Sequence, residues 1–109
     1  MQRSFSVYVE FDTADISPDT YADLFDALHD VDGAAGPAPN GNASMRLTVQ
    51  AYSVMQAAID GTERAQAAAI THGLSPDAVI GLEVITEAER NRRNALEEVP
   101  APYRQERGA

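Results

Sequence analysis

Cysteine, tryptophan and lysine are all absent from this chain of 109 residues. The lack of cysteine excludes disulfides, thiolate metal sites and cysteine nucleophiles, and it fits a chain that never meets an oxidising compartment. Aromatic residues make up only 6% of the chain, so a core must be filled by Val, Ile, Leu and Ala. No run approaches the roughly 20 apolar residues of a membrane span, and the N-terminus lacks a secretory pattern. We therefore expect a cytoplasmic protein without a membrane segment.

Positive charge is also scarce. The formal net charge is -9, and residues 1–32 hold eight acids against Arg3. Such a surface repels phosphate backbones, so direct binding of nucleic acid by the folded core is disfavoured. The only basic cluster is Arg90, Arg92 and Arg93. The charge therefore favours a protein partner over a nucleic acid.

Strand patterns occupy four segments of the chain. Residues 4–12 and 44–51 alternate strictly between apolar and polar side chains, and residues 79–85 form an aliphatic run. Residues 34–38 are expected to form a short edge strand, because proline fits a sheet only at its edge. The side chains predicted to face the core from these strands are Phe5, Val7, Val9, Phe11, Met45, Leu47, Val49, Ala51, Ile80, Leu82 and Val84.

Capping residues mark the starts of three helices. Ser17 opens a first helix that Gly33 ends, and Ser53 opens a second that reaches about His72. A third, polar helix is predicted over residues 87–98. At 100° per residue, the side chains predicted to face the core are Tyr21, Leu24, Phe25, Leu28 and Val31 of the first helix, and Val54, Met55, Ala58, Ile59, Thr62, Ala65 and Ala69 of the second.

This order of elements predicts an α+β fold, specifically a ferredoxin-like βαββαβ two-layer sandwich with a C-terminal helix. We assign residues 1–86 to the ferredoxin-like domain and residues 87–109 to the C-terminal helix and a frayed tail. Both longer helices are expected to cover one face of the sheet. The other face stays open and is the predicted partner-binding surface, formed by Tyr8, Glu10, Arg46, Thr48, Gln50, Glu83 and Ile85.

Residues able to carry catalysis are few. Only His29 and His72 could act as bases or metal ligands, and each stands near a helix end without a second ligand close in sequence. Ser17, Ser53 and Ser75 occupy capping positions, which leaves no serine with a reason to be a nucleophile. We therefore expect no enzyme activity, no metal and no cofactor.

An acidic stripe lies opposite the predicted core face of the first helix, formed by Asp19, Asp23, Asp26 and Asp30. Acids four residues apart on a solvated helix repel one another and stay hydrated, which is the simplest interpretation. Alternatively, the stripe mimics a phosphate backbone and inhibits a protein that binds DNA or RNA. Asparagine at all four positions would abolish such binding.

The segment Val79–Arg90 (VIGLEVITEAER), followed by Arg92 and Arg93, is similar to small actinobacterial and actinophage proteins in which a ferredoxin-like module precedes a DNA-binding helix-turn-helix. The resemblance spans residues 4–99. In that family the helix-turn-helix would follow, whereas here only residues 101–109 remain, so we expect it to be absent. The exclusive use of arginine and the heavy use of alanine also suggest a GC-rich genome. The resemblance implies a non-enzymatic regulatory or interaction module.

Three functions therefore stay open. The first, which we favour, is a non-enzymatic protein–protein interaction or dimerisation module that uses the open sheet face and the helix over 87–98. Its partner would be another protein or a second copy of itself. The second is the acidic nucleic-acid mimic. The third is a small-molecule-sensing domain, similar to ferredoxin-like regulatory domains that bind amino acids, with its ligand near residues 12–18.

Overall fold

The computed structural model describes residues 1–97, and each strand and helix lies close to its predicted position. In chain order the elements are β1 (Arg3–Ala14), α1 (Pro18–Ala27), β2 (Ala34–Pro37), β3 (Asn42–Ala51), α2 (Val54–Thr71), β4 (Val79–Thr86) and α3 (Glu87–Glu97). Short 3-10 turns at His29–Val31 and Pro76–Ala78 precede β2 and β4. The predicted tail beyond α3 lies outside the described residues. None of the described helices is both long and apolar enough to cross a membrane.

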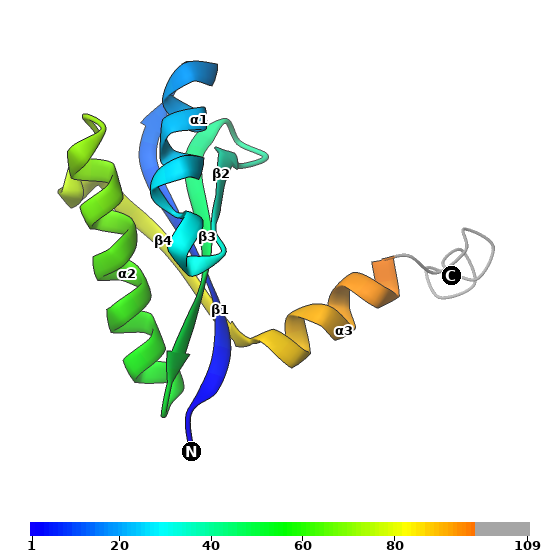
Figure 1. The fold of residues 1–109 in the computed structure, drawn as a ribbon. Helices are drawn as coiled ribbons and strands as arrows, with labels where there is room; N and C mark the ends of the chain where they lie inside the picture. The colour runs from blue at the N-terminus through cyan, green and yellow to red at the C-terminus, as the bar shows by residue number, and fades with distance from the viewer. Residues whose placement is uncertain (98–109) are drawn as a thin grey trace.

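The strands form one antiparallel sheet in the order β2-β3-β1-β4. β1 and β3 lie at its centre, where Val7 is opposite Leu47 and Tyr8 is opposite Arg46. α1 and α2 both lie over one face of this sheet (Figure 1). The protein is thus an α+β fold with one layer of strands and one layer of helices, as predicted.

The core lies between the sheet and these two helices. The strict alternation of β1 and β3 correctly predicts which side chains enter it, because successive side chains of a strand point to opposite faces. The buried side chains from the two central strands are Phe5, Val7, Val9, Phe11, Ala43, Met45, Leu47 and Ala51. The core is light, since the helices add mainly leucine and alanine.

α1 buries a narrower stripe than predicted. Leu24 and Leu28 are fully buried, whereas Phe25 is 52% exposed, so its prediction as a core residue is wrong. The reason is that α1 packs over the short edge strand β2, which offers little sheet to cover. The chain then reverses at Asp32, which has a φ of 52°, rather than at Gly33. Gly33 is needed for space instead, because a Cβ there would lie 2.6 Å from the Cβ of Leu28.

α2 presents only part of its predicted face to the sheet, since Ala65 and Ala69 are buried as predicted but the larger side chains of that face are not. Its large side chains Val54, Met55 and Ile59 are 51%, 73% and 51% exposed, so their prediction as core residues is wrong. The residues that α2 buries are all small, namely Ala57, Gly61, Ala65, Ala68 and Ala69. Small side chains let the helix backbone come close to the sheet, and a Cβ at Gly61 would lie 2.7 Å from Cγ1 of Val7.

β4 departs from simple alternation near its start. Ile80 has no partner residue in β1, so it is the extra residue of a β-bulge. The bulge changes which side chains point inward: Val79 packs against the core, and Ile80, predicted to be buried, is 54% exposed. Val84 packs inward as predicted. Leu82 stays 48% exposed because β4 is an edge strand of the described sheet.

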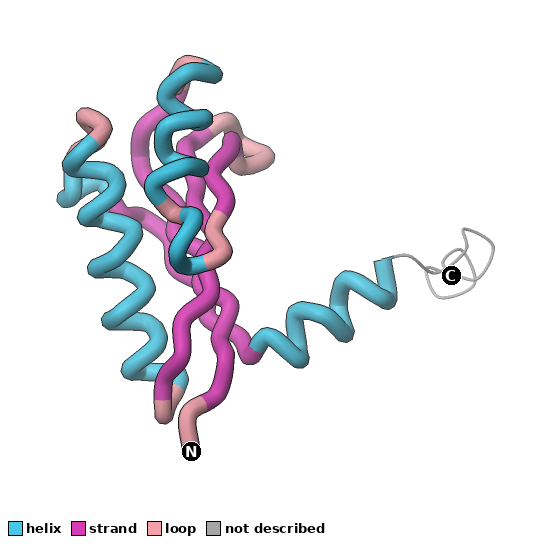
Figure 2. The backbone as a smooth tube through the Cα atoms, in the orientation of Figure 1, coloured by secondary structure: helices cyan, strands magenta, loops and turns pink. Residues whose placement is uncertain are grey.

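α3 begins directly where β4 ends. The predicted cap is present, since the backbone N–H of Glu89 donates a hydrogen bond to Oγ1 of Thr86 at 3.1 Å. The helix then projects away from the two layers (Figure 2). Residues 91–96 are all exposed. α3 therefore contributes its first turns, rather than its whole length, to the surface of the sheet.

Candidate functional site

The open sheet face carries a row of three predicted residues across its central strands. Tyr8 of β1 lies opposite Arg46 of β3 on one side and opposite Glu83 of β4 on the other. One step along the strands, Ile85 lies opposite Ser6, which in turn pairs with Thr48. The remaining predicted residues of this face lie at its two ends, Glu10 at one and Gln50 at the other.

Polar contacts within the sheet hold this row in place. The guanidinium of Arg46 lies over the ring of Tyr8, 5.1 Å from its centroid, and NH1 donates a hydrogen bond to Oγ of the buried Ser6 at 3.1 Å. The Tyr8 hydroxyl donates to Oε1 of Glu10 at 3.3 Å. Glu10 also accepts a hydrogen bond from Nδ2 of Asn40 at 3.2 Å. Side chains tied in this way are prearranged and lose little conformational entropy on binding.

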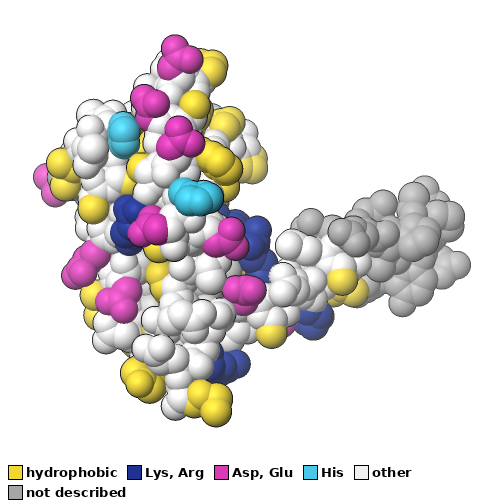
Figure 3. Space-filling model, viewed as in Figure 1, with side chains coloured by type: hydrophobic (Ala, Val, Ile, Leu, Met, Phe, Trp, Pro, Cys, Tyr) yellow, Lys and Arg dark blue, Asp and Glu magenta, His cyan; other side chains and the backbone are white. Residues whose placement is uncertain are grey.

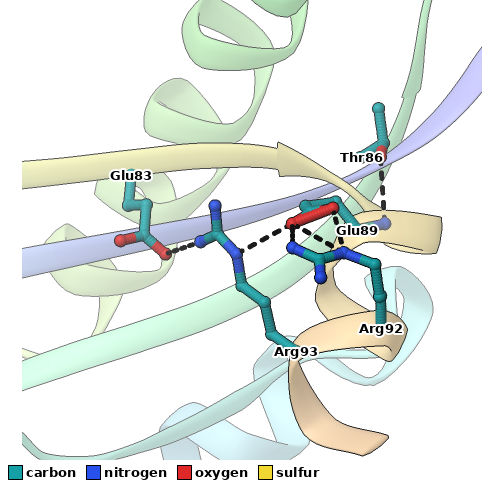
Figure 4. Close-up of polar contacts among 5 residues, drawn as sticks. All are labelled: Glu83, Thr86, Glu89, Arg92 and Arg93. Atoms are coloured by element: carbon teal, nitrogen blue, oxygen red, sulfur yellow. Dashed lines mark hydrogen bonds and ion pairs between the residues drawn. The ribbon is translucent and has the colours of Figure 1, made fainter. Parts of the chain in front are cut away.

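A group of charges on α3 extends the open face (Figure 4). Arg93 lies between two carboxylates, with its Nε 3.2 Å from Oε1 of Glu89 and its NH1 3.9 Å from Oε1 of Glu83. Arg92 donates to Glu89 as well, from Nε to Oε2 at 2.9 Å. Hydrogen bonds, first from Arg92 and then from Arg93, lower the pKa of Glu89 to about 2. Glu89 therefore fixes the orientation of both arginines at ordinary pH.

A polar cleft of 360 Å³ lies between α3 and the open face. Its lining residues are Arg46, Glu83, Ile85, Arg90, Arg93 and Asn94. Burial, and then the nearby charge of Arg90, lower the pKa of the Arg46 guanidinium. The sequence places Arg90 and Arg93 together in a basic cluster but gives no sign that they lie near Arg46. We refer to this set of six residues as the arginine cleft.

The predicted acidic stripe is not one continuous surface. Asp19, Asp23 and Asp26 are exposed on α1, and carboxylates gather over this helix on the side seen in Figure 3. Asp30 lies beyond the end of α1 and forms an ion pair of 2.7 Å with Arg64 of α2. The hydrogen bond from Arg64 lowers the pKa of Asp30. Because Arg64 also donates to the carbonyl oxygen of Ala27, this pair ties the two helices together.

An apolar flank runs along the outer side of β4 and the neighbouring face of α2. A groove of 330 Å³ there is lined by Ala58, Ile59, Thr62, Glu63 and Leu82. Ile59 and Leu82 are each about half exposed, and Met55 lies one turn before Ile59 on α2 and is 73% exposed. We call the set Met55, Ile59 and Leu82 the β4 flank. It arises because α2 buries alanines rather than its large side chains.

A third hollow lies at the opposite side of the sheet, beside β2. It measures 550 Å³ and is lined by Asp15, Ile16, Pro18, Tyr21, Ala35, Gly36, Pro37 and Gly41. Several of these residues belong to the segment 12–18, which the sequence indicated as the place for a small ligand. Desolvation by burial raises the pKa of the Tyr21 hydroxyl. We call this hollow the hairpin groove.

Metal-ligating side chains and the capping serines are the remaining candidates for chemistry. Within 1–97, no three metal-ligating side chains lie close enough to hold an ion. The three serines act as caps, as predicted: Ser17, Ser53 and Ser75 accept hydrogen bonds from backbone N–H groups two or three residues further on. Comparison with protein-family models, with curated proteins and with solved structures found no match to this chain. Its function must therefore be inferred from its own surfaces.

Proposed function

We propose that this chain is a non-enzymatic protein–protein interaction module that pairs with a second copy of itself. The proposal includes a ferredoxin-like arrangement, which is supported by the strand order β2-β3-β1-β4 and by helices on one face. It also includes a regulatory role, as the resemblance to modules that precede a helix-turn-helix implies. The observation that carries the proposal is the uncovered edge of the sheet at β4.

β4 is eight residues long and has a strand neighbour only on its β1 side. Its outer backbone N–H and C=O groups therefore face no strand of the described chain. Natural proteins usually protect such an edge with charge, proline or short length. Here the strand contains no proline and only one charged residue, Glu83, and its bulge at Ile80 lies near its start, so residues 81–86 keep regular pairing. The edge is thus available for pairing.

A second β4 is the simplest partner for this edge. Two identical strands that run antiparallel across a twofold axis make a self-complementary contact, and twofold dimers are the commonest oligomers of soluble proteins. The contact would join two sheets into one continuous sheet. The β4 flank of each copy, Met55, Ile59 and Leu82, would then be covered by the other copy, and its apolar surface would leave water.

The test is the oligomeric state of charge-introducing variants. The wild-type chain is expected to sediment with twice the monomer mass at high concentration. Ile59→Glu and Leu82→Glu are expected to weaken the dimer at least about tenfold, because disrupting a central interface residue costs about 2 kcal/mol. Equilibrium sedimentation over a range of concentrations measures this dissociation constant.

Phe25→Glu is the matched control, since Phe25 is 52% exposed on α1, outside the β4 flank. It is expected to leave the dimer intact. A wild-type chain that stays monomeric at every concentration would contradict the proposal. So would a loss of dimer in Phe25→Glu equal to that in the two flank variants.

The open sheet face was the partner surface that the sequence indicated, and that assignment stays a prediction. Most of its side chains are polar, and Tyr8, Glu10 and Arg46 are held by hydrogen bonds and ring contacts within the sheet, whereas the large exposed apolar side chains of α2 lie elsewhere. Apolar area removed from water is the main driving force of association. The β4 flank is therefore the better candidate for the dimer contact.

The hairpin groove favours a second candidate function, the sensing of a small molecule. Its volume of 550 Å³ lies within the range of about 300–1,000 Å³ that is usual for ligand sites. Free amino acids are the probes to use first. An amino acid that binds there is expected to raise the melting temperature, and Tyr21→Ala should reduce the shift because it removes a side chain that lines the groove. A panel of amino acids without effect on the wild-type chain would exclude this ligand class.

A further inference from the structure

Two arginines in the arginine cleft form no ion pair within the described part of the chain. Among the described residues, Arg46 donates to the hydroxyl of Ser6, lies over the ring of Tyr8 and feels the charge of Glu83 without forming an ion pair with it. Arg90 forms no ion pair with any described residue. Both side chains are half-buried. Arg93 completes the group, and its nearer carboxylate is Glu89 on its own helix. Three guanidinium groups therefore line a cleft that contains one carboxylate.

This arrangement is unusual in a chain with a formal net charge of -9. Carboxylates are plentiful, yet Arg46 and Arg90 are held near each other from different elements, β3 and α3. Like charges brought together and partly removed from water repel one another. An anion placed between them would relieve the repulsion and would accept the paired hydrogen bonds that guanidinium groups offer to carboxylate and phosphate oxygens.

The size and surroundings of the cleft limit the ligand to a small one. Its volume of 360 Å³ is near the lower end for small-molecule sites. A long polyanion such as a nucleic acid would also meet the aspartates of α1 and the overall negative charge, which repel phosphate backbones. Ile85 adds an apolar wall, and Asn94 adds an amide that can donate or accept a hydrogen bond.

We infer that the arginine cleft is a binding site for a small anion that carries two or more negative charges on phosphate or carboxylate groups. Arg46 and Arg90 would hold the anion from opposite sides, and Arg93 would turn from Glu83 toward it, since their contact is long at 3.9 Å. Glu89 would keep Arg93 oriented. The site lies on the open face and goes beyond the proposed dimerisation, which uses the β4 flank.

The experiment is titration calorimetry of the full chain with inorganic phosphate and, separately, with citrate, at constant ionic strength set by sodium chloride. The wild-type chain is expected to bind at least one of them with millimolar or tighter affinity. Binding of phosphate alone would identify a phosphate-bearing ligand, and binding of citrate alone would identify a carboxylate. Arg46→Gln and Arg90→Gln are each expected to weaken the binding about tenfold, because each removes a charged hydrogen-bond donor.

Arg3→Gln is the matched control, since it changes the net charge equally and Arg3 does not line the cleft. It is expected to bind as the wild type does. Arg90→Gln keeps the test valid if Arg46→Gln disturbs the sheet, because Arg90 lies on α3. The inference is overturned if neither anion binds, or if Arg3→Gln weakens binding as much as Arg90→Gln does. Tighter binding of a DNA duplex than of either anion would overturn the assignment to a small ligand.

Discussion

Replacing Gly61 by alanine is expected to lower the free energy of unfolding by about 1–3 kcal/mol, although alanine is the better helix former. At an exposed position in a helix the same change would stabilise the protein by about 1 kcal/mol. At Gly61 the added methyl group would lie 2.7 Å, 2.8 Å and 2.9 Å from Cγ1, Cγ2 and Cβ of Val7. Val7 is fully buried on the central strand β1, so it cannot move aside. Urea unfolding followed by far-ultraviolet circular dichroism measures the change.

Two comparisons make this prediction specific. Gly36→Ala places a methyl group where no atom lies within 4 Å, and it is expected to change the stability by less than about 0.5 kcal/mol. The double variant Gly61→Ala/Val7→Ala should cost less than the sum of its two single changes, because the second change makes room for the first. A stabilised Gly61→Ala protein would mean that α2 does not pack on β1 through this residue.

The central strands could be predicted from the sequence together with their buried faces. Apolar and polar residues alternate strictly along β1 and β3. Since successive side chains of a strand point to opposite faces of the sheet, this alternation places all the apolar side chains on one face. Phe5, Val7 and Met45 are buried as that alternation requires. The caps at Ser17 and Ser53 could also be predicted, because capping depends on contacts within three residues.

The buried face of α2 could not be predicted in the same way. Alanine occurs on every side of this helix, so the apolar pattern does not single out one face. A prediction from the sequence therefore follows the largest apolar side chains and places them in the core. What decides the face is how closely the backbone can approach β1, and only Gly61 has no Cβ to prevent it. The bulge at Ile80 likewise depends on the pairing of β4 with β1, which the sequence of β4 alone does not contain.

In the candidate sites, too, the features that depend on neighbouring residues could be predicted, whereas those that depend on contacts between distant segments could not. The row of Tyr8, Arg46 and Glu83 follows from strand alternation and could be predicted as part of the open face. Its meeting with Arg90 depends on the direction in which α3 leaves β4, which follows from the packing of α3 against β1 and β4. The arginine cleft is therefore visible only in three dimensions, although each of its residues is obvious in the sequence.

Replacing Leu28 by alanine is expected to lower the free energy of unfolding by about 2–5 kcal/mol, whereas Phe25→Ala on the same helix is expected to cost less than about 1 kcal/mol. The sequence pattern predicts equal burial for the two residues, but Leu28 is fully buried and Phe25 is 52% exposed. Leu28 stands at the turn that ends α1, where its backbone carbonyl oxygen accepts hydrogen bonds from the backbone N–H groups of Val31 and Gly33. Truncation would leave a cavity beneath this turn, because Gly33 has no side chain to fill it. Urea midpoints of the two variants compare them directly, and equal losses would mean that α1 presents both residues to the core.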